Sequence, residues 1–269
     1  IAGHYGDEFA ELHGKQMVLR EALGASIPSA GVGCAFARDA LQKLSARTQG
    51  KPFDADSMTE DYELGLHLTG GTSRGIFARL RDRSGQWVAT QEFFPDRLED
   101  AIRQKSRWMA GISLSGWDRL GWQNDWRENW MRLRDRKASF AAIVLAIAYI
   151  AILLTGLLSL AEMTGSYRPQ PVSRFLKILL VLNAGFLLWR LMMKVYFVFS
   201  LYGLREAMLS IPRTVVANMI NIMAVWRALR QYVGQLAGQP ARWEKTSHFY
   251  PDAGNVKQLR PRYSPEDRG

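Results

Sequence analysis

A run of 24 residues without a charged side chain, Ala138–Ala161, constrains the fold of this chain more than any other feature. As an α-helix, such a run is about 36 Å long, which exceeds the roughly 30 Å hydrocarbon core of a bilayer. We therefore expect a transmembrane helix over residues 138–161. A second span is expected over about residues 175–202, although three basic side chains interrupt it and must reach the interface or face protein. These are Lys177, Arg190 and Lys194.

The distribution of charge predicts an orientation for these spans. The stretch Arg127–Lys137 holds five basic and two acidic residues, whereas Glu162–Arg174 holds two basic and one acidic. By the positive-inside rule, the first 137 residues are expected in the cytoplasm, and the second span returns the chain there. The net charge of +10 fits an anionic membrane surface or a phosphorylated substrate. Nucleic-acid binding is not expected, because the cations flank the membrane segments and form no aromatic-studded strip.

An apolar stripe follows the second predicted span. Its members recur at spacings of three and four, with Pro212 at a position tolerated near the start of a helix. They are Ile211, Val215, Met219, Ile222, Trp226, Leu229 and Val233. Interleaved arginines favour an amphipathic helix over residues 204–238 that lies in the membrane interface, in preference to a third span. The alternative is a helix buried against the N-terminal part. Residues 239–269 are polar and are expected to form a cytoplasmic tail.

Residues 1–125 mix helical and strand-like patterns with glycine-rich turns, which indicates an α/β domain. Ser57-Met58-Thr59-Glu60 has the spacing of a capping box, so a helix is expected to begin near Ser57. Residues 76–80 and 86–93 resemble two strands joined by a turn, which predicts a hairpin. The single Cys34 excludes an internal disulfide and a zinc site of two cysteines.

Two patches of this domain carry groups that transfer of a sugar from a nucleotide donor would need. Glu60 and Asp61 fall in the first turn of a helix, where the dipole favours the ionised form, and Asp61 could accept a proton from a hydroxyl. Further along, Gln104-Lys105-Ser106-Arg107-Trp108 combines an amide, a permanent cation and an indole. Arg107 can bind diphosphate oxygens and Trp108 can stack on a sugar ring. Taken singly, each patch has a plainer explanation: helix capping for the first, and a helix surface anchored by Trp108 for the second.

The order Thr-Glu-Asp, Gln-x-x-Arg-Trp and then membrane helices resembles the pattern of processive family-2 glycosyltransferases, such as cellulose, hyaluronan and chitin synthases. A longer agreement, over roughly residues 7–250, resembles the bacteriophage adsorption protein B branch of that family. The segments that carry it are Asp7-Glu8-Phe9-Ala10-Glu11, Pro28–Gly33, Leu120-Gly121-Trp122, Ile211-Pro212-Arg213 and Trp243–His248.

The resemblance implies that residues 1–125 are the acceptor-side, C-terminal half of a GT-A (nucleotide-diphospho-sugar transferase) domain, followed by a membrane region over residues 126–203. Asp61 would be the general base, with Glu60 supporting its loop. Gln104, Arg107 and Trp108 would line the acceptor and diphosphate site, with Arg103 as a second diphosphate neighbour and residues 31–36 flanking the acceptor. Trp243, Lys245 and Thr246 would form a gating loop over the donor. The alternative for this last segment is an interfacial tryptophan beside a lysine.

No metal site is expected within this chain. Members of the family carry an Asp-x-Asp metal motif well before Thr-Glu-Asp, and Asp54-Ala55-Asp56 stands too close to take that role. The resemblance therefore implies that Mg or Mn binds in a longer parent protein. The N-terminus has no initiator methionine and no signal-peptide pattern, which also indicates a cut through a larger protein. The fragment alone is expected to be inactive.

These inferences predict a multi-pass protein of the bacterial inner membrane with a cytoplasmic catalytic part. It would be an inverting transferase that moves a sugar from a nucleotide-sugar donor to a growing glycan, with export of the product across the membrane. One alternative is a non-processive transferase that acts on a lipid-linked acceptor. Another is a non-enzymatic membrane protein of an envelope complex, used as a phage receptor component with an outer-membrane or envelope partner.

Overall fold

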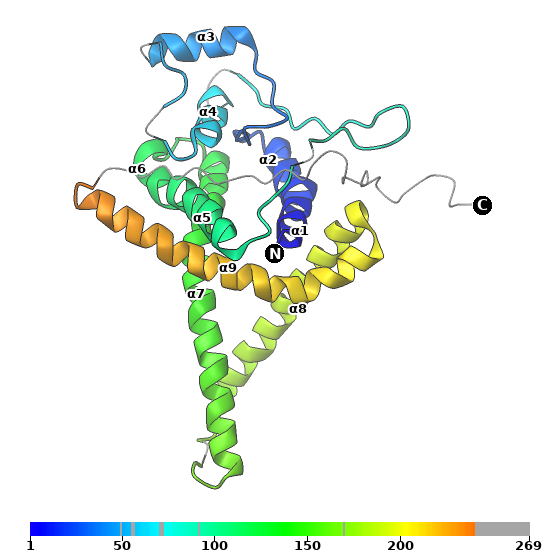
Figure 1. The fold of residues 1–269 in the computed structure, drawn as a ribbon, viewed down its shortest axis with the longest axis vertical. Helices are drawn as coiled ribbons and strands as arrows, with labels where there is room; N and C mark the ends of the chain where they lie inside the picture. The colour runs from blue at the N-terminus through cyan, green and yellow to red at the C-terminus, as the bar shows by residue number, and fades with distance from the viewer. Residues whose placement is uncertain (49, 55–56, 70–72, 91, 169, 240–269) are drawn as a thin grey trace.

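The computed structural model describes residues 1–239, except 49, 55–56, 70–72, 91 and 169. The predicted gating-loop residues Trp243, Lys245 and Thr246 thus lie outside the described residues. A compact N-terminal part sits on a long helical hairpin that projects away from it (Figure 1). Its helices are α1 (Gly3–Glu11), the π-helical segment η1 (Leu12–Gln16), α2 (Met17–Ala22), α3 (Arg38–Arg47), α4 (Glu60–Thr69), α5 (Leu98–Trp108), the π-helical segment η2 (Met109–Ser115) and α6 (Gly116–Leu120).

The projecting hairpin consists of α7 (Trp126–Met163) and α8 (Arg174–Tyr202), and it contains both predicted spans. Each helix is long and apolar enough to cross a membrane. In α7, Asp125 caps the start by accepting a hydrogen bond from the Arg127 N–H at 2.8 Å. None of the most apolar window of α8 is buried within the protein, and only 6% of that of α7. Apolar surface of this extent requires a non-aqueous environment.

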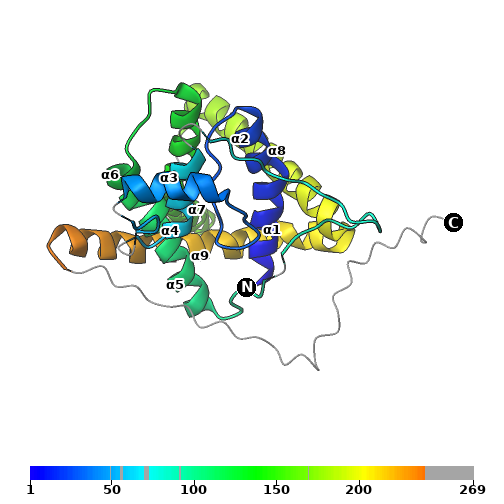
Figure 2. The same ribbon diagram turned by 90° about the horizontal axis from the view of Figure 1, so that it is seen from above.

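A third helix, α9 (Leu204–Leu236), is also long and apolar enough to cross a membrane by length and composition. It turns away from α8 at Gly203, whose φ of 81° suits glycine, and lies crosswise to the hairpin (Figure 1). Seen from above, α1 and α5 both cross it (Figure 2). The face packed against them is built mainly of small residues: Ala207, Ser210, Ala217, Ile220, Ala224, Val225 and Ala228. Most of the predicted apolar stripe is exposed instead, namely Ile211, Val215, Met219, Trp226 and Val233.

The predicted capping box does not form. Helix α4 begins at Glu60, three residues later than the pattern indicates. The Ser57 hydroxyl accepts a hydrogen bond from the Thr59 N–H at 3.2 Å and donates to Glu63 Oε1 at 2.8 Å. Ser57 therefore bonds to the carboxylate of Glu63, one turn beyond the Glu60 of the predicted capping box. The Glu63 side chain is buried, so its oxygens need hydrogen-bond donors.

The expected α/β domain is not observed, since the described residues contain no β-sheet. The hairpin over residues 76–93 keeps its predicted turn and pairs through a single bridge, Arg81 to Trp87. Flanking hydrogen bonds run from the Asp82 N–H to Gln86 O at 2.8 Å and from the Val88 N–H to Leu80 O at 3.0 Å. Most of its apolar side chains are exposed, with Ile76 at 72%, and Phe77 alone among its described apolar residues is partly buried, against His13. So little core covers the hairpin that longer strands gain no stability here.

Candidate active site

Two glycines bring the start of α4 into close contact with its neighbours. A Cβ on Gly65 would lie 2.2 Å from the Ser29 backbone nitrogen, so the Ile27–Ser29 segment crosses α4 there. A Cβ on Gly111 would lie 2.4 Å from Thr59 Oγ1, so η2 presses against the residue that precedes α4. Asp61 is therefore held between a backbone loop and the helix that carries Gln104 and Arg107.

The Asp61 carboxylate is half-buried beside this loop. Its Oδ1 accepts a hydrogen bond from the Tyr62 N–H at 2.8 Å. On the other side, a Cβ on Gly31 would lie 3.0 Å from Asp61 Oδ2. Burial raises the pKa of Asp61 above its usual value, and the neighbouring charge of Glu60 adds to this, while the Tyr62 N–H and Arg107 oppose it. The carboxylate is thus a stronger base than an exposed aspartate.

The charge of Arg107 has a small lowering effect on the pKa of Asp61, which connects the two patches of the sequence electrostatically. Gln104, Arg107 and Gly111 follow one another at helical spacing, so the contact at Gly111 aligns this face with α4. Gln104 is only 4% exposed, and its Oε1 has no hydrogen-bond partner among the described residues. An unmatched buried acceptor is costly unless a further group binds it.

Trp108 lies beside these residues but packs into the core. Its ring meets Tyr5 edge-on at 6.0 Å and Phe9 at 6.4 Å, and Phe94 stacks on Tyr5 at 4.6 Å. These contacts fit the packing alternative, while the side chain stays partly exposed and its role in binding a sugar stays a prediction. Arg103 stands one turn before Arg107 on α5 and is half-buried.

Glu60 points to another part of the surface. It is exposed and lines a cavity of about 460 Å³ between α3 and α4, together with Lys51 and His67. The two neighbouring acids of the Thr-Glu-Asp motif thus have different surroundings, since Asp61 lies beside Gly31 and Glu60 lines the cavity. Among the described residues, no group of three or more His, Cys, Asp or Glu side chains could hold a metal ion.

Comparison with known proteins identifies the family. The profile described as glycosyl transferase family group 2 matches residues 1–229. The chain belongs to this family. It is 37% identical over 281 aligned residues to "Bacteriophage adsorption protein B" of Escherichia coli K12. "Bacteriophage N4 adsorption protein B" of Escherichia coli O157:H7 gives the same identity. Both alignments cover 96% of this chain but only 37% of the relative's length. No solved structure matches the chain.

The resemblance to family-2 glycosyltransferases is therefore confirmed. In this chain, an ion-pair network that sequence patterns do not reveal supports the helix that begins with the Thr-Glu-Asp motif. Arg119 donates from Nε to Glu63 Oε1 at 2.7 Å and from its terminal nitrogen to Glu63 Oε2 at 3.0 Å. The same side chain pairs with Asp54. Arg119 and Glu63 are 56 positions apart, and no local spacing signals their contact.

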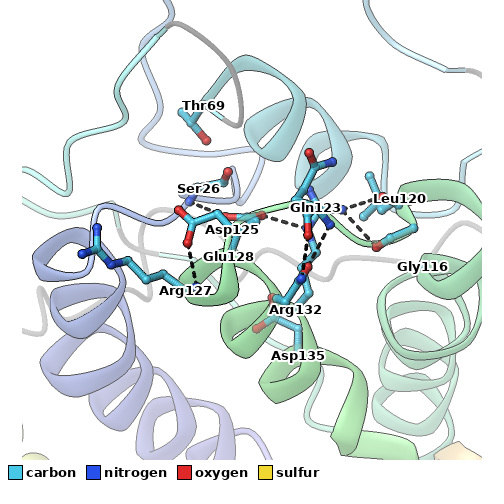
Figure 3. Close-up of polar contacts among 12 residues, drawn as sticks. Ser26, Thr69, Gly116, Leu120, Gln123, Asp125, Arg127, Glu128, Arg132 and Asp135 are labelled. Carbon is cyan, nitrogen blue, oxygen red and sulfur yellow. Dashed lines mark hydrogen bonds and ion pairs between the residues drawn. The ribbon is translucent and has the colours of Figure 1, made fainter.

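A second network fixes this glycosyltransferase domain to the start of α7 (Figure 3). Glu128 accepts hydrogen bonds from the Ser26 N–H and from Arg132 Nε, both at 2.8 Å. Asp135 accepts from the hydroxyl of Tyr62, the residue after Asp61, and from Arg20. Farther along, Arg136 donates to the carbonyls of Gly116 and Gly121 at 2.6 and 2.7 Å.

Two of the five basic residues counted for membrane orientation, Arg132 and Arg136, are thus buried in the protein. Their charges stabilise the junction between α7 and the N-terminal part, so they do not face lipid headgroups. The orientation inferred from charge then depends on the remaining basic residues of this stretch, Arg127, Arg134 and Lys137.

Proposed function

We propose that this chain is the acceptor-side half of the catalytic domain of an inverting, membrane-bound glycosyltransferase. Its parent protein moves a sugar from a nucleotide-sugar donor to a growing glycan. The observation that carries this proposal is the position of Asp61: a loop comes within contact distance of its carboxylate, and η2, which follows the Gln-x-x-Arg-Trp motif, contacts Thr59 two residues before it.

In the proposed reaction, the acceptor hydroxyl oxygen attacks the anomeric carbon of the donor sugar. The new glycosidic bond forms as the bond from that carbon to the diphosphate oxygen breaks, which inverts the configuration. Asp61 takes the hydroxyl proton, and Arg107 offsets the negative charge that develops on the diphosphate. The place of Gln104 in the acceptor site rests on the resemblance alone, because its side chain is buried.

The family commonly uses a divalent metal, but the described residues offer no set of ligands for one. Mg or Mn would be bound by other parts of the parent protein, and no step above depends on it. The gating loop at Trp243–Thr246 stays part of the proposal on the resemblance alone.

For the membrane, α7 and α8 are proposed to span the bacterial inner membrane, with the N-terminal part in the cytoplasm. We assign α9 to the membrane interface, although its length and composition would also allow a span. Two observations support the interface: 28% of its most apolar window is buried against the protein, and its exposed apolar stripe lies on the opposite face.

The test is release of nucleoside diphosphate by the full-length parent in lipid nanodiscs, screened over sugar donors with Mg or Mn. We expect release by the wild type, and loss of at least about a hundredfold in Asp61→Asn. Asp82→Asn, in an exposed turn, is the matched control and should leave the rate unchanged. If no donor supports release by the wild type, the transferase proposal is overturned in favour of the receptor function that the relatives' names suggest. Product length then separates transfer to a growing glycan from a single transfer to a lipid-linked acceptor.

A further inference from the structure

The two positions that the Gln-x-x-Arg-Trp pattern leaves open are occupied here by Lys105 and Ser106, and both are buried, at 4% and 1% exposure. They point away from Asp61, toward α1 and α9. Lys105 Nζ donates to both carboxylate oxygens of Glu8 at 2.6 Å and to Asn221 Oδ1 at 3.1 Å. The Ser106 hydroxyl donates to Gln231 Oε1 at 3.2 Å. The motif helix is thus hydrogen-bonded to α9 at two points.

Apolar packing between α5 and α9 reinforces these hydrogen bonds. Ala101 of α5, Tyr5 of α1 and Ile220 of α9 form one buried cluster, against which Trp108 packs. The two α9 partners, Asn221 and Gln231, are about 15 Å apart along a helix, so they resist rotation of α5 as well as its translation. Any movement of α9 therefore moves the helix that carries Gln104 and Arg107.

The opposite face of α9 exposes large apolar side chains with an arginine among them. Val215 is 51% exposed, Met219 39% and Trp226 59%, and the Arg230 guanidinium lies 4.8 Å from the centre of the Trp226 ring. Apolar residues flanked by arginine and tryptophan are typical of a helix that lies at the boundary between lipid and water.

The level at which α9 crosses α7 identifies the occupant of this face as the bilayer surface. Ala142 is the last buried residue of α7. From Ile143 to Met163 the helix is about 31 Å long, which matches the hydrocarbon core of a bilayer. Six residues into this stretch, about 9 Å along the helix, Asn218 of α9 donates to the Tyr149 hydroxyl at 3.1 Å. This depth is the one at which an interfacial helix buries its apolar face, about 5–10 Å below the headgroups.

We propose that α9, by lying on the bilayer surface, holds α5 and the following η2 in the orientation that keeps η2 against Thr59, beside Asp61, with Lys105 as the positioning residue. Sugar transfer then depends on contact of α9 with the lipid surface, and not only on insertion of α7 and α8 into the bilayer. This inference rests on the proposed function for its effect on turnover, whereas the coupling of α9 to α5 can be measured without turnover.

The experiment is hydrogen–deuterium exchange of the full-length parent in lipid nanodiscs, read at the amides of residues 104–111. Loss of a buried hydrogen bond to a charged group should speed exchange there by about tenfold in Asn221→Leu. Ser106→Ala removes the second hydrogen bond with little change of volume and should act in the same direction. Asn218→Leu is the matched control: it lies one turn away on α9, bonds to α7, and should leave exchange of this segment unchanged.

Charges placed on the exposed face, Val215→Glu with Met219→Glu, weaken lipid contact without touching α5. We expect the same faster exchange at residues 104–111 and a lower kcat, with the donor KM unchanged. Unchanged exchange in this double variant would overturn the proposal. If exchange responds but the wild type releases no nucleoside diphosphate, the coupling stands and the transferase function falls.

Discussion

Gly31 lies directly against Asp61, and its φ of +74° belongs to the left-handed region that favours glycine. A methyl group there would come 3.0 Å from Asp61 Oδ2, and the backbone would be strained as well. The loop and the proposed base therefore constrain each other, which makes this position the most direct test of the site.

Gly31→Ala should lower the rate of nucleoside diphosphate release by at least about tenfold, because the added methyl displaces the carboxylate or closes the space beside it. Gly24→Ala is the matched control. Gly24 has a similar φ of +69°, but a Cβ there meets nothing within 4 Å. Both variants should lose about 1 kcal/mol of stability from backbone strain. Equal activity of the two variants would contradict the proposed position of the site.

The raised pKa of Asp61 predicts a characteristic dependence of stability on pH. Burial of the carboxyl favours its protonated form in the folded state, so Asp61 contributes stability at low pH that is lost as pH rises through its folded pKa. Asp61→Asn removes this loss and should therefore be more stable than the wild type at neutral pH. The difference should vanish below the ordinary pKa of 3.8. Chemical denaturation across pH measures it, and a destabilised variant at pH 7 would contradict the sign.

The raised pKa of Asp61 should also shift the pH profile of turnover toward higher pH. Because the base is inactive once protonated, release of nucleoside diphosphate should fall on acidification at a higher pH than an exposed aspartate would give. The acid limb of the kcat profile measures this value. A limb at the ordinary aspartate pKa would mean that another group accepts the proton.

Gly111→Ala should move the Thr-Glu-Asp motif and the Gln-x-x-Arg-Trp motif apart in space. Its Cβ would lie 2.4 Å from Thr59 Oγ1, so η2 and the preceding α5 must shift away from α4. We expect kcat to fall by about a hundredfold, since a displacement of roughly 1 Å can have this effect. Gly116→Ala is the control, because the nearest atom to its Cβ would be 3.6 Å away. Similar kinetics for the two variants would argue against a role for this contact.

Arg119→Met should destabilise the N-terminal part by about 3 kcal/mol, because it leaves the buried Glu63 carboxylate without its cation. Adding Glu63→Gln should restore much of the loss, and a double-mutant cycle of unfolding free energies measures the coupling. Arg205→Met is the comparison, since the ion pair of Arg205 with Glu206 is exposed and long at 3.8 Å. A cycle without coupling would show that the Arg119 contacts do not stabilise the motif.

The sequence predicts those features that depend on local pattern. The uncharged run gives α7 its apolar length, and the stripe on α9 is exposed as an interfacial helix requires. Ser57 shows the limit of such patterns, because its spacing fits a capping box while a buried carboxylate further along competes for the hydroxyl. The strands expected over residues 76–93 fail for a different reason, since alternation stabilises a strand only where a core covers one face.

Within the site, the motifs predict which residues matter, but their orientation depends on contacts far apart in the chain. Trp108 has the chemistry to stack on a sugar, and its ring also packs edge-on against Tyr5 and Phe9. Lys105 would be expected on a helix surface, but Glu8 and Asn221 bury it. The burial of Lys105 does not follow from local spacing, because its partners lie 97 and 116 positions away in the chain.

Helix α7 runs without interruption from Trp126, at the junction with the N-terminal part, to the far end of the hairpin, over 38 residues or about 57 Å. The part of this helix after its last buried residue, Ile143–Met163, is about 31 Å long, so in a bilayer whose core is roughly 30 Å thick the helix stands close to the membrane normal. The N-terminal part is fixed to the same helix and leans with it. Membrane thickness therefore sets the angle at which the site faces the lipid surface, and a thinner bilayer would tilt the whole molecule.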